Sequence, residues 1–110
     1  MLIYKIFRAD EWATLQIDGE TVGAPIDVAD GYIHFSTADT VAETAAKYFT
    51  DVEDLVLLAV EPDNLAPLKW EPARDDVLFP HLYRKLRMED VVWSKPLPLS
   101  DGAHQFPDLS

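Results

Sequence analysis

Two histidines in this sequence each stand two residues away from a tyrosine. His34 lies in the segment DGYIHFSTAD beside Tyr32, and His81 lies in FPHLYRK beside Tyr83. An imidazole can donate and accept hydrogen bonds and can carry charge near neutral pH, so either segment could do acid–base chemistry or hold a polar ligand. The alternative for His34 is a core histidine whose ring bonds a backbone carbonyl or Tyr32.

The segment DGYIHFSTAD alternates polar and apolar residues, which predicts a strand. Successive side chains of a strand point to opposite sides. Ile33 and Phe35 would then face one way, while Tyr32, His34 and Ser36 face the other. The histidine therefore belongs to the polar face of the predicted strand.

An anion site is predicted where this strand leads into a helix. Apolar residues recur with the helical period over residues 41–49, and Ser36 and Asp39 have the spacing of a capping box. Free backbone N–H groups after Ser36 and Thr37 would attract a phosphate or carboxylate. Arg84, in the basic segment RKLR, could bind the same anion. The alternative is that these cations only balance nearby acids at a solvated strand end.

A tryptophan and a carboxylate are adjacent in the segment KWEP. Trp70 could provide a stacking surface, and Glu71 a hydrogen-bond acceptor, for a ribose or an amine. The alternative places Trp70 in the core and leaves Glu71 as an exposed acid.

The composition excludes several classes of function. The chain has 110 residues, no cysteine and a formal net charge of -11. Disulfides and thiolate chemistry are therefore excluded, and long nucleic acids and anionic membranes are unlikely partners. No segment is long and apolar enough to span a bilayer, so we expect a cytoplasmic protein. No two histidines share helical spacing, and we predict no metal site.

The elements that must position these residues form a strand-rich α+β domain. We predict strands over residues 2–7, 31–36 and 55–60, helices over 10–19 and 41–49, and an extended loop over 20–30. Prolines after residue 62 divide the remaining chain into short extended pieces, with a last strand before Pro96. We expect a single domain over residues 1–110, with a core over 1–98 and an irregular tail over 99–110.

Five segments together resemble a known family. The segments IYKI, DGYIHFST, DLVLLAV, KWEP and FPHLY look like those of short, uncharacterised bacterial proteins labelled as a domain of unknown function. The resemblance covers most of residues 2–85. It implies an ADP-ribosyltransferase-like fold, with a split β-sheet core and two helices near the N-terminus. The sequence is similar there to the NAD-dependent RNA 2′-phosphotransferases.

The resemblance also implies site residues. In the phosphotransferase branch, a strand of the type L-Y-H-G-T precedes a segment of the type V-H-L-S. Residues 3–6 fall on the first pattern and residues 33–36 on the second. Lys5 stands where the active relatives have a histidine that holds the NAD ribose.

This resemblance makes a nucleotide or another small anionic ligand the expected partner and NAD the candidate cofactor. Glu71 would stabilise a sugar cation, while His34 and Ser36 hold the ribose or phosphate. The residues that we predict to be catalytic are His34, Glu71 and His81, and those predicted to bind the ligand are Lys5, Tyr32, Ser36, Thr37, Trp70, Tyr83 and Arg84.

Two other functions fit the same residues. The first is a binding or interaction module that has lost the chemistry, as Lys5 in place of the histidine suggests. The second is an enzyme that acts on another small anionic substrate with His34 or His81 as general base. Whether the chain is an enzyme is left open by the sequence.

Overall fold

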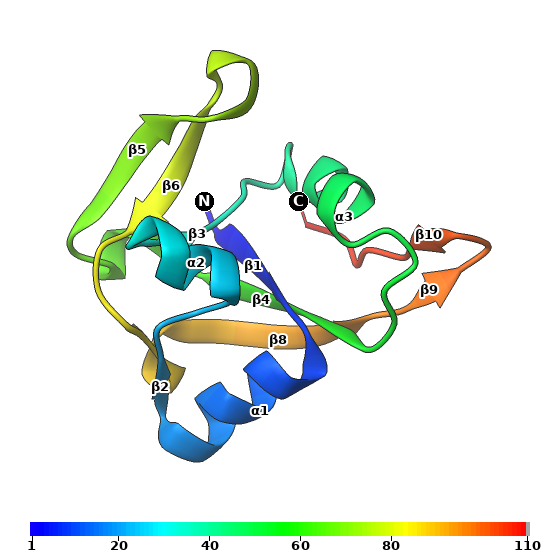
Figure 1. Cartoon of the computed structure of the whole chain (residues 1–110), viewed down its shortest axis with the longest axis horizontal. Coiled ribbons are helices and arrows are strands. Elements are labelled where there is room, and N and C mark those ends of the chain that lie inside the picture. The colour runs from blue at the N-terminus through cyan, green and yellow to red at the C-terminus, as the bar shows by residue number, and fades with distance from the viewer. Residues whose placement is uncertain (110) are drawn as a thin grey trace.

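The computed structural model describes residues 1–109, except for the side chain of Arg74. Its framework is a pair of antiparallel three-stranded sheets (Figure 1). The first sheet has the order β1 (Ile3–Phe7), β4 (Leu55–Val60), β8 (Val91–Leu97). The second sheet has the order β3 (Ile33–His34), β6 (Leu78–Leu82), β5 (Leu68–Pro72).

Helices and short strand pairs surround the two sheets. The α-helices are α1 (Ala9–Asp18), α2 (Pro25–Asp30) and α3 (Val41–Tyr48). Short 3₁₀ turns occupy Pro62–Asn64, Arg74–Asp76 and Met88–Asp90. Two-residue strands pair as β2 (Glu20–Thr21) with β7 (Leu86–Arg87), and β9 (Leu99–Ser100) with β10 (Ala103–His104). None of the helices within residues 1–109 combines the length and the apolar character needed to cross a membrane.

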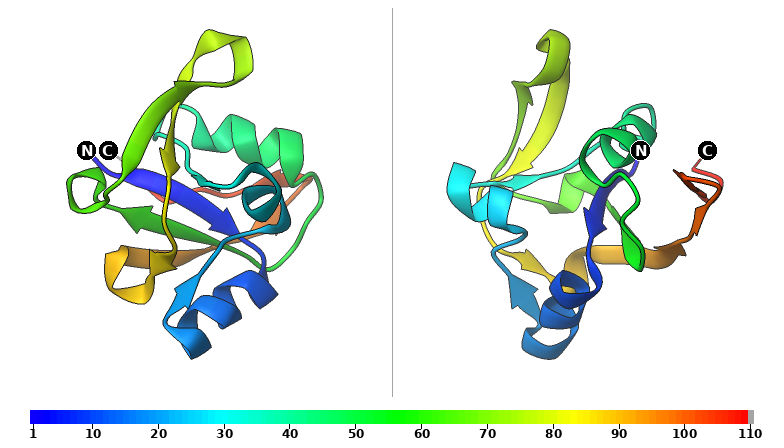
Figure 2. Two further views of the ribbon diagram at one scale, coloured as in Figure 1. Left: turned by 60° about the vertical axis from the view of Figure 1, so that its left-hand side comes forward. Right: turned by 45° about the vertical axis from the view of Figure 1, so that its right-hand side comes forward.

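Strand β4 is the centre of the core because both of its faces are buried. Leu58 and Val60 belong to a cluster that the first sheet shares with α1 and the second sheet. Leu57 and Ala59 belong to a second cluster beneath α3 and the end of the chain. Figure 2 shows α3 and the C-terminal segment together on one side of the first sheet. A strand buried on both faces reads as a continuous apolar run, as residues 55–60 do.

The α+β class is confirmed, and so are the predicted helices near residues 10–19 and 41–49. The extended loop predicted over residues 20–30 is wrong, since this stretch holds β2 and α2. Pro25 occupies the first turn of α2 and Gly31 ends it in the left-handed conformation. A six-residue helix is too short to show an apolar period, which explains the error.

The end of the chain is more regular than the sequence predicted. Residues 99–104 form the β9–β10 hairpin instead of an irregular tail. Phe106 and Leu109 pack against the second core cluster. Strand β8 continues through Pro96, which is possible because β8 lies at the edge of its sheet. The last residues therefore complete the core beneath α3.

Candidate functional site

His34 and His81 lie side by side in the second sheet. The two residues are directly paired between β3 and β6, and their ring centroids are 5.3 Å apart. The ring of Tyr32 lies 4.7 Å from His34, 4.2 Å from His81 and 5.2 Å from Tyr83. Segments about 50 residues apart in the sequence thus build one site. We call Tyr32, His34, His81 and Tyr83, with the carboxylates Asp30 and Glu71, the histidine cluster.

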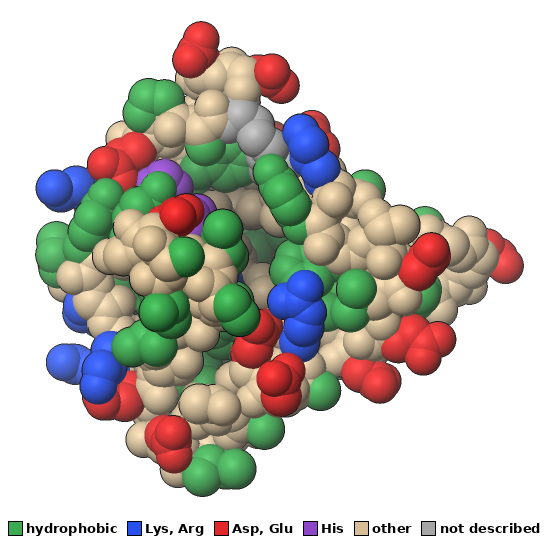
Figure 3. All heavy atoms as spheres, in the orientation of Figure 1, with side chains coloured by type: hydrophobic (Ala, Val, Ile, Leu, Met, Phe, Trp, Pro, Cys, Tyr) green, Lys and Arg blue, Asp and Glu red, His purple; other side chains and the backbone are tan. Residues whose placement is uncertain are grey.

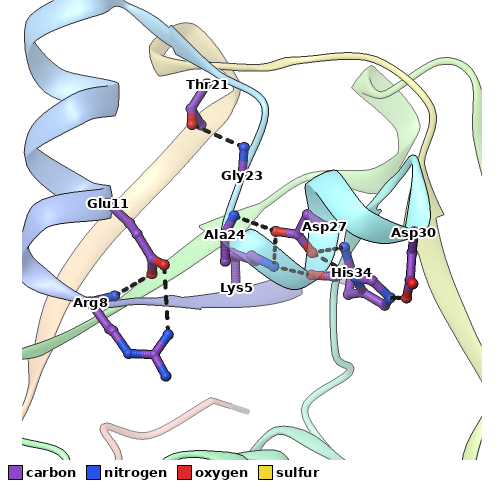
Figure 4. Close-up of polar contacts among 9 residues, drawn as sticks. All are labelled: Lys5, Arg8, Glu11, Thr21, Gly23, Ala24, Asp27, Asp30 and His34. Atoms are coloured by element: carbon purple, nitrogen blue, oxygen red, sulfur yellow. Dashed lines mark hydrogen bonds and ion pairs between the residues drawn. The ribbon is translucent and has the colours of Figure 1, made fainter.

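His34 is held between two carboxylates (Figure 4). Its Nδ1 lies 2.6 Å from Asp27 Oδ1, and its Nε2 lies 2.9 Å from Asp30 Oδ2. A neutral imidazole has one N–H and can donate to only one of them, whereas an imidazolium can donate to both. Asp27 is fully buried and Asp30 is partly exposed. A ligand can therefore take the place of Asp30 at Nε2 while Asp27 keeps the ring in position.

Asp27 is the hub of the polar contacts beneath the cluster. Its Oδ2 accepts hydrogen bonds from Lys5 Nζ at 2.7 Å and from the Ala24 backbone N–H at 2.8 Å. Its Oδ1 also accepts the His34 backbone N–H at 3.0 Å. Burial alone would raise the pKa of Asp27, but the bond from His34 and the Lys5 charge outweigh it and lower the pKa. Asp27 is therefore an ionised carboxylate inside the protein.

Lys5 is the buried counter-ion of Asp27. Its Nζ also donates to the His34 carbonyl oxygen at 2.9 Å, so it ties β1 to β3. Burial lowers the pKa of Lys5, and the Asp27 carboxylate opposes that shift. The predicted ligand-binding residue Lys5 thus lies beneath the histidine cluster, where its ammonium is already occupied.

A glycine makes room for the Asp27 carboxylate. Gly23 has φ +99°, which favours glycine, and a Cβ built there would lie 2.3 Å from Asp27 Oδ2. Thr21 Oγ1 accepts the Gly23 N–H at 3.0 Å and fixes the turn before α2. Sequence reasoning missed Asp27. The pattern of Pro25 and Gly31 around it was the one available sign of a helix.

His81 is anchored in the same way as His34. Its Nδ1 lies 2.8 Å from Glu71 Oε1, and the Tyr83 hydroxyl donates to the same oxygen at 2.6 Å. The His81 side chain is buried, while Glu71 remains partly exposed. The hydrogen bonds from Tyr83 and His81 lower the pKa of Glu71. The bond to Glu71 raises the pKa of Tyr83 to about 12.

The contact between Tyr83 and Glu71 predicts a displaced tyrosine titration. NMR of ring-labelled tyrosine should show one phenol with a pKa of about 12, absent from Tyr83→Phe. In Glu71→Gln the negative charge is gone, so this pKa should fall toward the ordinary value near 10. Glu53→Gln, a change at an exposed acid that the cluster does not contain, should leave it unchanged. A Tyr83 phenol that titrates near 10 in the unchanged chain would contradict the contact.

Several predicted residues lie outside the cluster. Trp70 and Glu71 are consecutive in β5 and therefore point to opposite faces. Arg84 forms a two-pronged ion pair with Asp90, at 2.9 and 3.1 Å, and also donates to the Ala66 carbonyl. The basic segment thus balances nearby acids, which was the alternative for it. Neither Trp70 nor Arg84 is brought to the histidines.

Ser36 and Thr37 also have other roles. Ser36 is buried, exchanges two backbone hydrogen bonds of 2.8 Å with Tyr4, and has its Oγ 3.0 Å from Thr44 Oγ1. The Thr37 N–H donates to Thr40 Oγ1 at 2.9 Å. The predicted capping box at Ser36 is wrong because α3 begins at Val41, after Thr40. Ser36 instead joins the two sheets.

The cluster borders a depression of the surface. Figure 3 shows the face hollowed between the β5–β6 hairpin, α2 and α3, with histidine side chains at its edge. The His34 side chain is 30% exposed, which leaves it accessible to a ligand. Within residues 1–109, no group of three or more histidine or acidic side chains is placed to hold a metal ion. The site can thus offer the imidazole of His34, further hydrogen bonds and negative charge.

The family of the chain follows from a comparison with family models. The family described as "Protein of unknown function (DUF952)" matches residues 6–94. The chain belongs to this family. The match confirms the predicted resemblance to a domain of unknown function, and it includes all of the histidine cluster. No curated protein matches the chain.

Solved structures of one bacterial protein are similar to this DUF952 chain along nearly its whole length. The crystal structure of protein CC0527 from Caulobacter crescentus has 45% identity and a TM-score of 0.91, and covers 96% of this chain and 94% of that one. The solution NMR structure of CC0527 has 43% identity and a TM-score of 0.83, and covers 94% and 90%. These names state no ligand or reaction.

Proposed function

We propose that this chain is a nucleotide-binding domain of the ADP-ribosyltransferase-like class, and that its histidine cluster binds the nicotinamide-ribose end of NAD. The observation that carries the proposal is the pairing of His34 and His81 in neighbouring strands, each fixed by a carboxylate at Nδ1. A ring held at Nδ1 presents Nε2 in a defined direction, which suits the hydroxyl groups of a ribose.

The split sheet supports this class of fold. The segments IYKI and IHFS, which carry the resemblance to the phosphotransferases, meet where Tyr4 and Ser36 form a bridge between the two sheets. Lys5 then reaches from β1 to the His34 carbonyl. Strands β1 and β3, one from each sheet, thus meet at the cluster.

The local charge supports the cationic end of NAD over a phosphate group. Asp30 and Glu71 flank the imidazoles, while Arg84 and Lys85 are paired with Asp90 and Glu20. Carboxylates attract the positively charged nicotinamide ring and repel phosphates. The anionic ligand expected from the sequence therefore contacts the cluster through its nicotinamide-ribose end, and its phosphate groups lie away from Asp30 and Glu71.

The same carboxylates support a transferase step. The bond between the ribose carbon and the nicotinamide nitrogen breaks, and its electron pair leaves with the neutral nicotinamide. The positive charge that develops on the sugar is stabilised by a fixed carboxylate, a role that Glu71 can fill. The oxygen of an acceptor hydroxyl group would form the new bond to the same ribose carbon, and its proton would pass to His34 Nε2 in place of the Asp30 contact. Asp27 would hold the ring in position.

Calorimetry with NAD, ADP-ribose and AMP tests the proposal. NAD should bind to the unchanged chain, and His34→Ala should weaken binding by up to about tenfold because the hydrogen bond from the imidazole to the ribose is lost. The matched control is His104→Ala, since His104 bonds the Val52 carbonyl outside the cluster. Equal affinity in His34→Ala, or no NAD binding at all, would refute the site.

Release of nicotinamide distinguishes a transferase from a binding module that has lost the chemistry. Free nicotinamide that accumulates with time supports the transferase. NAD binding without release supports the module that has lost the chemistry, in agreement with Lys5 being bonded to Asp27.

The Asp27–His34 pair favours a second candidate function, general acid–base catalysis on another substrate. A buried carboxylate 2.6 Å from Nδ1 orients an imidazole as it does in hydrolases. An activity that survives Glu71→Gln but is lost in His34→Gln would favour this function, because it requires no carboxylate for a sugar cation.

A further inference from the structure

Trp70 lies outside the histidine cluster and lines a separate cavity. The cavity has a volume of about 510 Å³, and its walls include Glu61, Asp63 and Trp70 with the apolar side chains Met1, Leu65 and Leu68. Trp70 belongs to the face of β5 opposite to Glu71. The indole of Trp70 and the carboxylates of Glu61 and Asp63 have no role in the proposed function, so this cavity is a second candidate site.

Glu61 brings an unsatisfied acceptor to this cavity. Its Oε2 is buried and has no hydrogen-bond partner among the described residues. Buried polar atoms are nearly always hydrogen-bonded, and a carboxylate oxygen without a donor is costly. This oxygen is sealed from solvent, so a donor in the cavity reaches the Glu61 carboxylate after the side chain turns toward it.

The other walls define the rest of the ligand. Trp70 is 39% exposed, so an aromatic face is available to a ligand, and Leu65 and Leu68 supply apolar surface. Asp63 adds a second negative charge at the rim, and the whole chain has a net charge of -11. An anion would be repelled here, whereas a cation is attracted by the acids and by the ring.

We propose that this cavity binds a small organic cation, namely a primary ammonium or guanidinium group on an apolar stem. The charged group donates to Glu61, and the stem lies along Trp70 and the leucines. A quaternary ammonium has no N–H and would leave the Glu61 oxygen unsatisfied. The cavity is within the size range of small-molecule sites, so a stem of several carbons fits.

A set of matched probes tests this site in the full chain. Titration with n-hexylamine should shift the NMR signal of the Trp70 indole N–H with a Kd on the order of 1 mM, as expected for so small a ligand. Hexyltrimethylammonium and hexanoate should bind at least about tenfold more weakly, because the first lacks the donor and the second has the wrong charge. Equal binding of either probe would overturn the proposal.

Variants locate the binding and separate it from the proposed function. Glu61→Gln should weaken n-hexylamine binding at least about tenfold. Glu53→Gln, at an exposed acid outside the cavity, should not change it. Trp70→Phe keeps an aromatic face and should retain part of the affinity for n-hexylamine. This affinity is measured from the NMR signals of the neighbouring residues. His34→Ala should bind n-hexylamine with unchanged affinity. A lack of NAD binding at the histidine cluster would therefore leave the n-hexylamine result standing.

The source of the cation is decided by a peptide arm. A short acetylated peptide with one lysine presents the same ammonium and stem as n-hexylamine. Binding of both probes shows that the cavity can take a lysine side chain of a protein, and binding of the amine alone restricts the ligand to a free amine. Absence of shifts with n-hexylamine up to about 20 mM, or equal binding by Glu61→Gln, would refute the site.

Discussion

Asp27→Ala is expected to lower the free energy of unfolding by about 3–5 kcal/mol, the cost of breaking a buried ion pair. The change leaves the Lys5 ammonium in the interior without its carboxylate, and leaves the Ala24 and His34 N–H groups without an acceptor. Lys5 can shed its proton to limit the penalty, which keeps the effect within this range. Urea unfolding followed by circular dichroism measures it.

Asp30→Ala is the matched control for this change. Asp30 contacts the other nitrogen of His34 but is partly exposed, so its removal should cost no more than about 1 kcal/mol. Similar losses in the two variants would contradict the role of Asp27 as the buried hub.

The effect of Asp27→Ala should also depend on pH. The pKa of Asp27 is lowered in the folded chain, so its charge stabilises the fold above the unfolded carboxyl pKa of about 3.9. That stabilisation is lost as the pH falls through the lower, folded pKa. The difference between the unchanged chain and Asp27→Ala should therefore be full at neutral pH and should narrow at acidic pH.

The side of its strand to which His34 points was within reach of the sequence. The alternation in DGYIHFSTAD put His34 on the polar face of its strand, and Ile33 and Phe35 are indeed in the core. A short strand carries this information in its own pattern, because each side chain can point to only one of two faces. The segment of β6 was predicted only as one of the short extended pieces after residue 62, and its pairing with β3 is a tertiary contact that the structure shows.

Asp27 could not be found by the same reasoning. Its role depends on Lys5 of β1 and His34 of β3, and on the space left by Gly23. A single acid in a stretch without a period has no local sign of burial, and ionised carboxylates are mostly exposed. Tertiary contacts therefore decide its position.

The sequence did contain the information that separates Trp70 from Glu71. Adjacent residues of a strand face opposite sides, so a tryptophan and a carboxylate side by side in KWEP cannot both face one ligand. The same rule places Trp70 of β5 on the face away from Glu71 and the histidines.

The second large effect is expected from Leu58→Ala, which should lower the free energy of unfolding by about 3 kcal/mol. Leu58 is fully buried in the central strand β4. It shares a core cluster with Ile33 and Leu82, which neighbour the two histidines in the sequence. The loss combines the transfer of the removed methyl groups with the cavity that they leave. Urea unfolding of the purified variant gives the value.

Leu57→Ala distinguishes packing in general from packing beneath the histidine cluster. Leu57 is equally buried but points to the other face of β4, beneath α3. We expect a similar loss of stability, yet the ring resonances of His34 and His81 should shift only in Leu58→Ala. This follows because strands β3 and β6 rest on the Leu58 side of the first sheet. Equal shifts in both variants would mean that the two core clusters move as one body, and that the cluster is not positioned by the packing between the sheets.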